Sequence, residues 1–354
     1  MAEEQQASRY QLRGGLQEVL PLADDKLENR VEQKWFSCLI PRAELKQLMQ
    51  RSDREGWKNF GPWLVLLVAS GTAGALVWGT WWAIPAFFIY GTIYSSSDAR
   101  WHECGHGTPF RTRWVNDALY HLSSFMTLRE AYFWRWSHSR HHSETYVVGR
   151  DMEIQVPRPA NLWKIAADYF YVFGGSNDIK RIVKHACGIM TPEALEFVPE
   201  AERWKMILSC RIYLAIVAAT LGLAIALGSF LPLLYIWTPR FYCGWHHQLV
   251  GVLQHAGLDE NVRDHRLNTR TVYMNPVWRF LYLNMNYHIE HHMFPMVPFF
   301  ALPKLHAAIK DQMPPPYPSC WAAYREMIPV LIKQSRDGVT FIKRPLPAPK
   351  PVAA

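Results

Sequence analysis

Three short clusters of histidine constrain the fold of this chain more than any other feature of its sequence. Two clusters share the pattern H-x-x-H-H, and the third holds two histidines four residues apart. Because positions i, i+3 and i+4 lie on one face of an α-helix, each cluster would present its imidazoles in a single direction. The clustered histidines are His102, His106, His138, His141, His142, His288, His291 and His292.

Clustering of this kind favours a metal site over a purely structural role. Neutral imidazole is a common ligand of iron, copper and zinc. A lone histidine is more often structural, but imidazoles buried close together are destabilising unless a cation organises them. Their number is too large for one four-coordinate zinc ion and suits two metal ions with four or five ligands each. The clusters therefore predict a di-metal centre.

Two long stretches without charge or histidine predict helices that cross a membrane. They cover residues 59–97 and 212–239, whereas charge is frequent elsewhere and the mean hydropathy is only −0.12. Since about 20 residues cross the hydrocarbon core, the first stretch accommodates a hairpin with its turn at residues 79–82. The second stretch has 28 residues, which is short for two spans. A second hairpin and one long tilted helix both remain open at this point.

The histidine clusters favour the second hairpin. A single span there would leave the third cluster on the opposite side of the membrane from the first two, and no shared metal site could form. We therefore expect an all-α integral membrane protein with four membrane helices in two hairpins, at about residues 61–100 and 206–253. A helical cap would hold the di-metal site. Positive charge collects on the cytoplasmic side of membrane proteins, so the net charge of +8 predicts a cytoplasmic cap on the inner or plasma membrane.

The segments outside the apolar stretches, and the placement of the cysteines, indicate how the chain is organised. Residues 1–60 form an N-terminal cytoplasmic segment without the hydrophobic core of a signal peptide. The membrane domain covers residues 61–310, and residues 311–354 form a cytoplasmic C-terminal segment with a proline-rich tail. Six scattered cysteines without a C-x-x-C motif argue against an iron–sulfur module, a zinc ribbon and a disulfide framework. No nucleic-acid-binding motif accompanies the positive charge.

The first cluster allows a different chemistry when it is considered alone. His102, Glu103 and His106 match the H-E-x-x-H pattern of zinc metalloproteases, in which both histidines bind zinc and the glutamate is the general base. A membrane zinc hydrolase is therefore a remote alternative, although it leaves the second and third clusters without a role. A metal-binding membrane protein without catalytic activity is another alternative, and it predicts bound metal without consumption of O2.

In their order and surroundings, the clusters resemble the three histidine boxes of the integral-membrane fatty acid desaturase and hydroxylase superfamily. The phrases HECGHGT, FWRWSHSRHH and NMNYHIEHHMFP carry the resemblance, which extends over roughly residues 60–310. It implies a non-haem di-iron centre that activates O2. It also implies a further ligand after the last membrane helix, where the phrase LQHAG contains His255. The implied ligands are His102, His106, His138, His141, His142, His255, His288, His291 and His292.

The resemblance implies an O2-dependent oxidoreductase, in the first place a desaturase that introduces a C=C bond into an acyl lipid. Attack on an unactivated C–H bond requires a redox-active metal, which excludes zinc and magnesium. The same centre would serve a hydroxylase, or an oxidative O- or N-demethylase of a smaller molecule. Because the sequence contains no haem domain like cytochrome b5, we expect electrons from a separate ferredoxin, Rieske-type protein or rubredoxin with its reductase.

Other residues are candidates for supporting roles. Carboxylates near the clusters could hold the imidazoles by hydrogen bonds: Asp98, Glu103, Asp151, Asp259 and Glu290. Aromatic residues could line a substrate channel or simply pack: Tyr132, Trp134, Trp136 and Tyr287. The histidines without box spacing are expected to be structural: His121, His185, His246, His247, His265 and His306.

Overall fold

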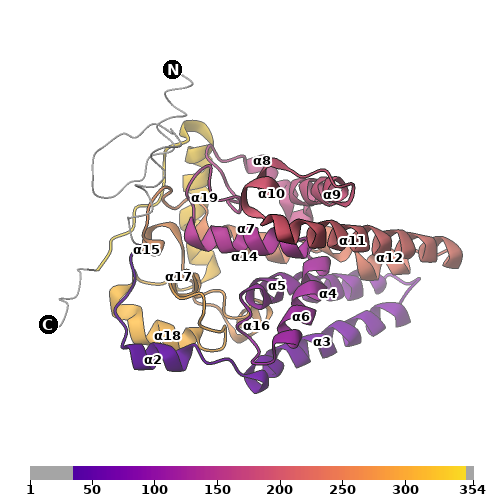
Figure 1. The fold of residues 1–354 in the computed structure, drawn as a ribbon, viewed down its shortest axis with the longest axis horizontal. Helices are drawn as coiled ribbons and strands as arrows, with labels where there is room; N and C mark the ends of the chain where they lie inside the picture. The colour runs from indigo at the N-terminus through magenta and orange to yellow at the C-terminus, as the bar shows by residue number, and fades with distance from the viewer. Residues whose placement is uncertain (1–34, 348–354) are drawn as a thin grey trace.

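The computed structural model describes residues 35–347, and this part of the chain is built of helices and loops (Figure 1). Within the described residues the only β-bridges are two isolated pairs, Thr271 with Tyr287 and Val272 with Tyr317. The expected all-α architecture is therefore confirmed. Most of the expected N-terminal segment and the last residues of the proline-rich tail lie outside the described residues.

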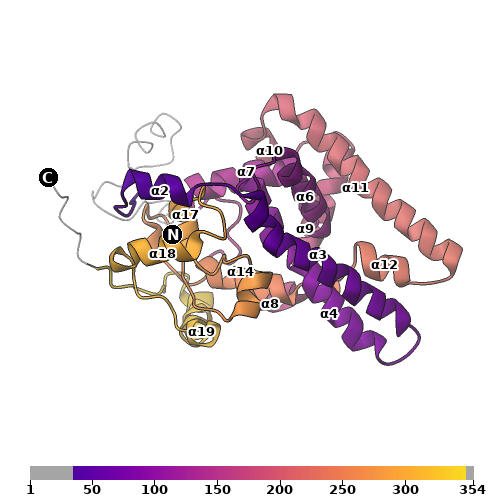
Figure 2. The same ribbon diagram turned by 90° about the horizontal axis from the view of Figure 1, so that it is seen from below.

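The first apolar stretch folds into the expected helical hairpin. Its helices α3 (Asp53–Leu76) and α4 (Ala83–Ser95) lie side by side in Figures 1 and 2. The turn occupies residues 77–82, as predicted, and Gly79 there has φ of +83°, a conformation that glycine adopts at little cost. At the start of α3, the Ser52 hydroxyl accepts a hydrogen bond from the backbone N–H of Glu55 and so caps the helix.

The chain passes from this hairpin directly into the first two histidine clusters. A single residue, Ser96, separates α4 from α5 and keeps a helical backbone conformation. Helix α5 ends at Gly107, which has φ of +64°. The carboxylate of Glu130 caps α7 by accepting two backbone N–H groups. The helices of this part are α5 (Ser97–His106), α6 (Arg113–Met126) and α7 (Ala131–Ser143).

The second apolar stretch is not one continuous helix, because the chain turns back on itself within it. Helix α11 (Glu200–Leu227) ends at Gly228, which adopts φ of +54°. The chain then returns through three short helices, two of which begin with a proline at the first or second helical position. The last two pack against α4. The returning helices are α12 (Leu231–Ile236), α13 (Pro239–Tyr242) and α14 (Trp245–His255).

The length of these helices supports only part of the expected membrane topology. Two helical stretches, Arg42–Leu76 and Glu200–Ala226, are long and apolar enough to cross a membrane. The returning legs are shorter, since α4 has 13 residues and the second leg is broken into α12, α13 and α14. Four membrane helices therefore stay a prediction.

The remaining helices form the cap and the connection between the hairpins. The largest buried apolar cluster joins α5 and α6 to the C-terminal part of the chain, with Trp101, Tyr120 and Leu305 among its members. In Figure 2 the C-terminal helices of the cap gather at the end of the molecule opposite the tips of the hairpins, whereas two helices of the connection lie beside α11. These helices are α2 (Arg42–Leu48), α8 (Leu162–Ala167), η3 (Asp168–Phe170), α9 (Val172–Ala186), α10 (Pro192–Phe197), α15 (His265–Asn268), α16 (Pro276–Leu281), α17 (His288–Met293), α18 (Leu302–Ile309), η4 (Lys310–Gln312) and α19 (Cys320–Asp337).

The close approach of α4 to α13 depends on Gly91. A Cβ atom at this position would lie 2.4 Å from the Tyr242 ring and 2.8 Å from the Cys243 sulfur. We expect Gly91→Ala to destabilise the protein by about 1–3 kcal/mol through overpacking, measured as a lower melting temperature in detergent. The matched variant Gly61→Ala, with nothing within 4 Å of the added methyl group, should melt at or above the wild-type temperature. Equal melting of both variants would contradict this account.

Candidate metal centre

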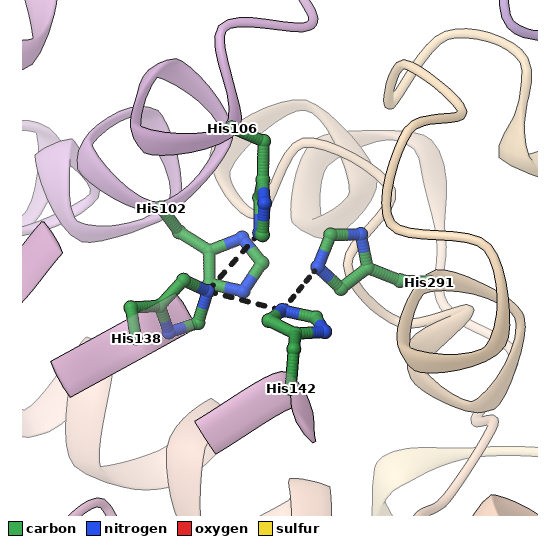
Figure 3. Close-up of side chains that lie close together, drawn as sticks. All are labelled: His102, His106, His138, His142 and His291. Carbon is green, nitrogen blue, oxygen red and sulfur yellow. Dashed lines mark hydrogen bonds between the residues drawn. The ribbon is translucent and has the colours of Figure 1, made fainter. Parts of the chain in front are cut away.

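Five of the expected ligands lie in one group, which Figure 3 shows with the rings converging from three helices. One ligand nitrogen of each ring lies within 4.8 Å of those of the others. We call this set the first group, and it consists of His102, His106, His138, His142 and His291.

The spacing inside the first group suits coordination of one ion. The Nε2 atoms of His106 and His142 each lie 3.1 Å from His138 Nε2, and His291 Nε2 lies 3.2 Å from His142 Nε2. Two ligand nitrogens about 2.1 Å from an ion and at right angles to each other are separated by about 3.0 Å. The imidazoles are therefore spaced as ligands of a common ion would be.

The other four expected ligands form a second group beside the first. The ligand atoms of His141, His255 and His292 lie within 4.8 Å of one another. His288 joins them, because its Nε2 lies 3.1 Å from Nε2 of His292. The rings of His142 and His292, one from each group, stack with their centroids 4.4 Å apart. The nine imidazoles thus divide into adjacent groups of five and four.

The H-x-x-H-H pattern explains this division. On α7, His138 and His142 are four residues apart and both join the first group, whereas His141 joins the second. On α17 the division is reversed, since His291 joins the first group while His288 and His292 join the second. Because successive helical residues are rotated by about 100°, one helix can supply ligands to two neighbouring points.

Hydrogen bonds fix which ring nitrogen is free in three of these histidines. Nδ1 of His141 donates to Asp151 at 2.8 Å, and Nδ1 of His138 donates to Glu153 at 3.1 Å. Nδ1 of His255 donates to the backbone carbonyl of Asn268 at 2.8 Å. A carbonyl oxygen can only accept, so the proton of His255 sits on Nδ1 and the lone pair on Nε2. Such partners orient metal-ligating imidazoles.

One buried imidazole nitrogen has no hydrogen-bond partner among the described residues, and this indicates whether the site suits a metal ion. Nε2 of His255 is buried and accepts no hydrogen bond among the described residues, although it carries the lone pair. The ring of His255 belongs to the second group, and its centroid lies 5.2 Å from that of His141 and 5.0 Å from that of His292. Burying an unpaired acceptor is unfavourable, and a cation at this point would satisfy it. The donor set therefore fits a metal ion that prefers imidazole.

The surroundings keep most of these rings neutral, which is the form that binds a metal. Burial, followed by the neighbouring imidazoles, lowers the pKa of His102, His138 and His292 well below the usual value. Burial, followed by the charge of His141, lowers the pKa of His106 to about 4. His141 differs, because the Asp151 carboxylate outweighs the effect of burial and raises the pKa of this ring.

Glu103 lies beside the first group and is fully buried. Its Oε1 is 3.6 Å from Nδ1 of His291 and 4.0 Å from Nδ1 of His102. Its Oε2 accepts hydrogen bonds from the Thr108 hydroxyl and the Phe299 backbone N–H. Burial raises the pKa of this carboxyl to about 8, and the two hydrogen bonds only partly offset that effect.

The carboxylates expected near the clusters divide into two sets. Asp151 contacts a clustered histidine and Glu103 lies beside two of them, as predicted. The prediction is wrong for Asp98, which pairs with His247 at 2.8 Å, and for Glu290, which pairs with His306 at 2.5 Å. The side chain of Asp259 accepts a hydrogen bond from the backbone N–H of Glu260.

Sequence reasoning missed Glu153, which holds His138. It lies 15 residues after His138 in the loop that follows α7, and no helical spacing connects the two. Its other carboxylate oxygen accepts from the Ser137 hydroxyl. Only its position two residues after the candidate Asp151, in the phrase RDMEI, could have drawn attention to it.

The histidines expected to be structural lie outside both groups. His265 is the nearest of those with a described contact to them, with its ring centroid 5.2 Å from that of His292, and its other face stacks on Trp35. His247 and His306 are held by the carboxylates described above, and His185 contacts the Thr191 hydroxyl.

Two hollows border the groups, and we name them the polar cavity and the surface depression. The polar cavity is bordered by histidines of both groups, including His102, His141 and His255. The histidines that border the surface depression all belong to the first group, and His106 and His142 are among them. Of the aromatic candidates, Trp134 borders the polar cavity and Trp136 the depression. Tyr132 instead borders an apolar hollow on α11, and Tyr287 packs on His306.

Comparison with known proteins agrees with this geometry. The family model of the fatty acid desaturases matches residues 79–324, which is more than half of the chain. The match begins in the turn of the first hairpin and includes all three histidine clusters and His255. It ends in α19.

Individual relatives are similar over most of their length. The sn-1 oleoyl-lipid 12-desaturase of Synechocystis is 23% identical over 83% of this chain and 84% of its own length. A probable fatty acid desaturase of Sorghum bicolor is 26% identical over 69% of this chain and 67% of its own. The sn-1 acyl-lipid omega-3 desaturase (ferredoxin) of a Nostoc strain is 24% identical over 70% of this chain and 73% of its own length. The chain therefore belongs to the fatty acid desaturase family of oxidoreductases.

Proposed function

We propose that this protein is an O2-dependent di-iron desaturase of acyl lipids that receives electrons from a separate ferredoxin-type donor. The observation that carries the proposal is the division of nine imidazoles into adjacent groups of five and four. We assign all nine as metal ligands, with one iron ion to each group. Nitrogen-rich sites of this size suit iron better than a closed four-coordinate zinc site.

A pair of iron ions held here would supply the activation of O2 for removal of hydrogen from an unactivated carbon. The complete reaction balances as follows: two hydrogen atoms leave adjacent carbons of the substrate, and a C=C bond forms. These hydrogens reduce one O2 to two water molecules, together with two electrons from the donor and two protons. The chain contributes neutral imidazoles, the hydrogen bonds of Asp151 and Glu153 that orient two of them, and burial that limits the access of bulk water.

The names of the relatives support the acyl-lipid substrate and the donor. Two of them are described as acyl-lipid or oleoyl-lipid desaturases, and one carries ferredoxin in its name. The basic character of the chain, with a net charge of +8, suits an acidic carrier.

One observation favours a second candidate, a hydroxylase or an oxidative O- or N-demethylase of a smaller molecule. The polar cavity beside both groups is bordered by Arg129, Glu153, Gln155, Arg181 and Gln254. A methylene chain buried against such groups would strip water from them without replacing its hydrogen bonds. A compact polar substrate would avoid that cost, and the same di-iron centre would oxidise it.

The proposed placement is in a membrane, with two hairpins spanning it and the cap in the cytoplasm. Large apolar side chains point outward from the hairpins: Val65 and Val68 on α3, Ile84 on α4, and Ile225 on α11 are all more than 60% exposed. Such a surface is unfavourable in water and suits lipid. Under this placement α4 and the α12–α14 segment complete the four spans.

The remote alternative of a zinc hydrolase finds little support in the geometry of its motif. Its general base would be Glu103, but both oxygens of this carboxyl face protein groups, and one of them accepts hydrogen bonds from Thr108 and Phe299. His102 and His106 lie with three further imidazoles rather than with one.

The nature of the product separates the two oxidative candidates. We expect iron-loaded protein, reduced ferredoxin and an oleoyl lipid under 18O2 to give a lipid with one additional double bond and no 18O. All of the label should appear in water, because the proposed reaction reduces both oxygen atoms. Lipid and small-molecule products are analysed by mass spectrometry. Label in an organic product, or release of formaldehyde, would contradict desaturation and favour the second candidate.

Removing a ligand from one group should affect one ion more than the other. We expect His255→Ala to lower the iron content from about two ions per chain to about one, and His106→Ala to do the same at the other group. Elemental analysis and Mössbauer spectroscopy measure the loss and show that different ions are missing. His121→Ala, an exposed histidine outside both groups, is the control and should retain both ions. Full iron content in both ligand variants would exclude the assignment.

Loss of the Glu153 carboxylate should weaken the first group without removing a ligand. In Glu153→Gln the charge that orients His138 is absent, and partners of this kind affect metal affinity on the order of tenfold or more. We expect faster transfer of iron to a competing chelator than in the wild-type protein. Glu44→Gln, an exposed carboxylate on α2, serves as the control. Identical transfer rates in all three proteins would show that Glu153 does not support the site.

A further inference from the structure

The first group approaches the surface of the protein at one place. Seven of the nine imidazoles are buried, whereas His106 and His142 are half-buried. Both of these border the surface depression, together with His102 and His138. A molecule seated in the depression would therefore contact ring edges of the first group directly, without passing through the polar cavity.

The rim of the depression has the composition of a protein interface. Trp136 is 36% exposed and Met296 is 41% exposed, and they border the hollow with Arg135, whose side chain is 38% exposed. Tryptophan, methionine and arginine are enriched at protein–protein interfaces. The apolar side chains of Trp136 and Met296 lie on the same rim as the charged Arg135. This mixture suits a transient protein–protein interface.

The surroundings of the depression are positively charged. From α5 to α7, Arg111, Arg113 and Arg135 reach the surface. Asp117 is the exposed carboxylate of this segment and pairs with Arg135 at 3.3 Å, so that two of the three arginines carry charge in excess of it. Arg113 lies seven residues from Tyr120, which borders the depression, or about 10 Å along α6. A partner covering about 800 Å² would span that distance.

We propose that the surface depression is the docking site of an acidic electron carrier, which passes electrons to the first group through the ring edges of His106 and His142. This assignment rests on the proposed function, since only a donor-dependent enzyme needs such a site. A one-electron carrier docks twice in each reaction cycle and supplies the two electrons in succession. The polar cavity, which histidines of both groups border, is not occupied by the carrier in this arrangement.

Binding measurements with a plant-type [2Fe–2S] ferredoxin test the proposal. The variant carries Arg113→Glu and Arg135→Gln together, and the control is Arg325→Glu, an exposed residue of α19. Figure 2 shows α19 on the side of the molecule away from α6 and α7. We expect the double variant to raise the Kd of ferredoxin about tenfold at low salt, in both metal-free and iron-loaded protein. The difference should shrink at high salt, where exposed charges are screened.

A second readout separates docking from folding and from the chemistry. Dithionite is a small reductant that needs no docking surface, so it should reduce the iron of the double variant at the wild-type rate. Melting temperature and iron content should also be unchanged. Should dithionite-reduced wild-type protein oxidise no substrate, the proposed function fails, whereas the ferredoxin affinities still decide the docking site.

Three results would overturn the docking site. One is equal affinity of the double variant and the wild-type protein for ferredoxin at low salt. Another is an equally large loss in Arg325→Glu, which would indicate a general effect of net charge. The third is weaker binding of the double variant to vesicles of anionic lipid with unchanged affinity for ferredoxin, which would assign this face to the membrane.

Discussion

Burial of nine imidazoles in one place is the constraint on which the rest of the structure depends. Most of the rings must stay neutral, because several cations buried side by side would repel one another and lose their hydration. Burial lowers the pKa of rings such as His102 and His292 far enough for this. The fold then has to bring four helices, α5, α7, α14 and α17, to a single point, although more than 150 residues separate His102 from His255.

Local patterns in the sequence predicted much of this arrangement. The spacing of His138, His141 and His142 predicted a helix with its three imidazoles on one face. α7 is that helix, but it directs His141 to the second group and the other two rings to the first. The charge-free stretch before Asp98 predicted the first hairpin and its turn. The need for the third cluster to meet the other two predicted that the chain turns back after α11, where hydropathy alone left two possibilities.

The contacts that depend on tertiary structure could not be predicted from the sequence. Glu290 lies between two clustered histidines of α17, but a residue two positions from His288 points to the opposite side of the helix, where it meets His306. Asp98 precedes the first cluster by one turn and is drawn instead to His247 and Arg240. Glu153 reaches His138 through a loop, and no periodicity of sequence marks such a partner.

The sharing of α7 and α17 between the two groups has a consequence for the proposed pair of ions. In that proposal neither helix would serve one ion alone, so the distance between the two groups of imidazoles would be set by two helical backbone segments rather than by the position of a loop. A helix of this kind resists stretching over a single turn. An ion of different radius would therefore be accommodated by rotation of individual rings, while the spacing of the pair stays nearly constant.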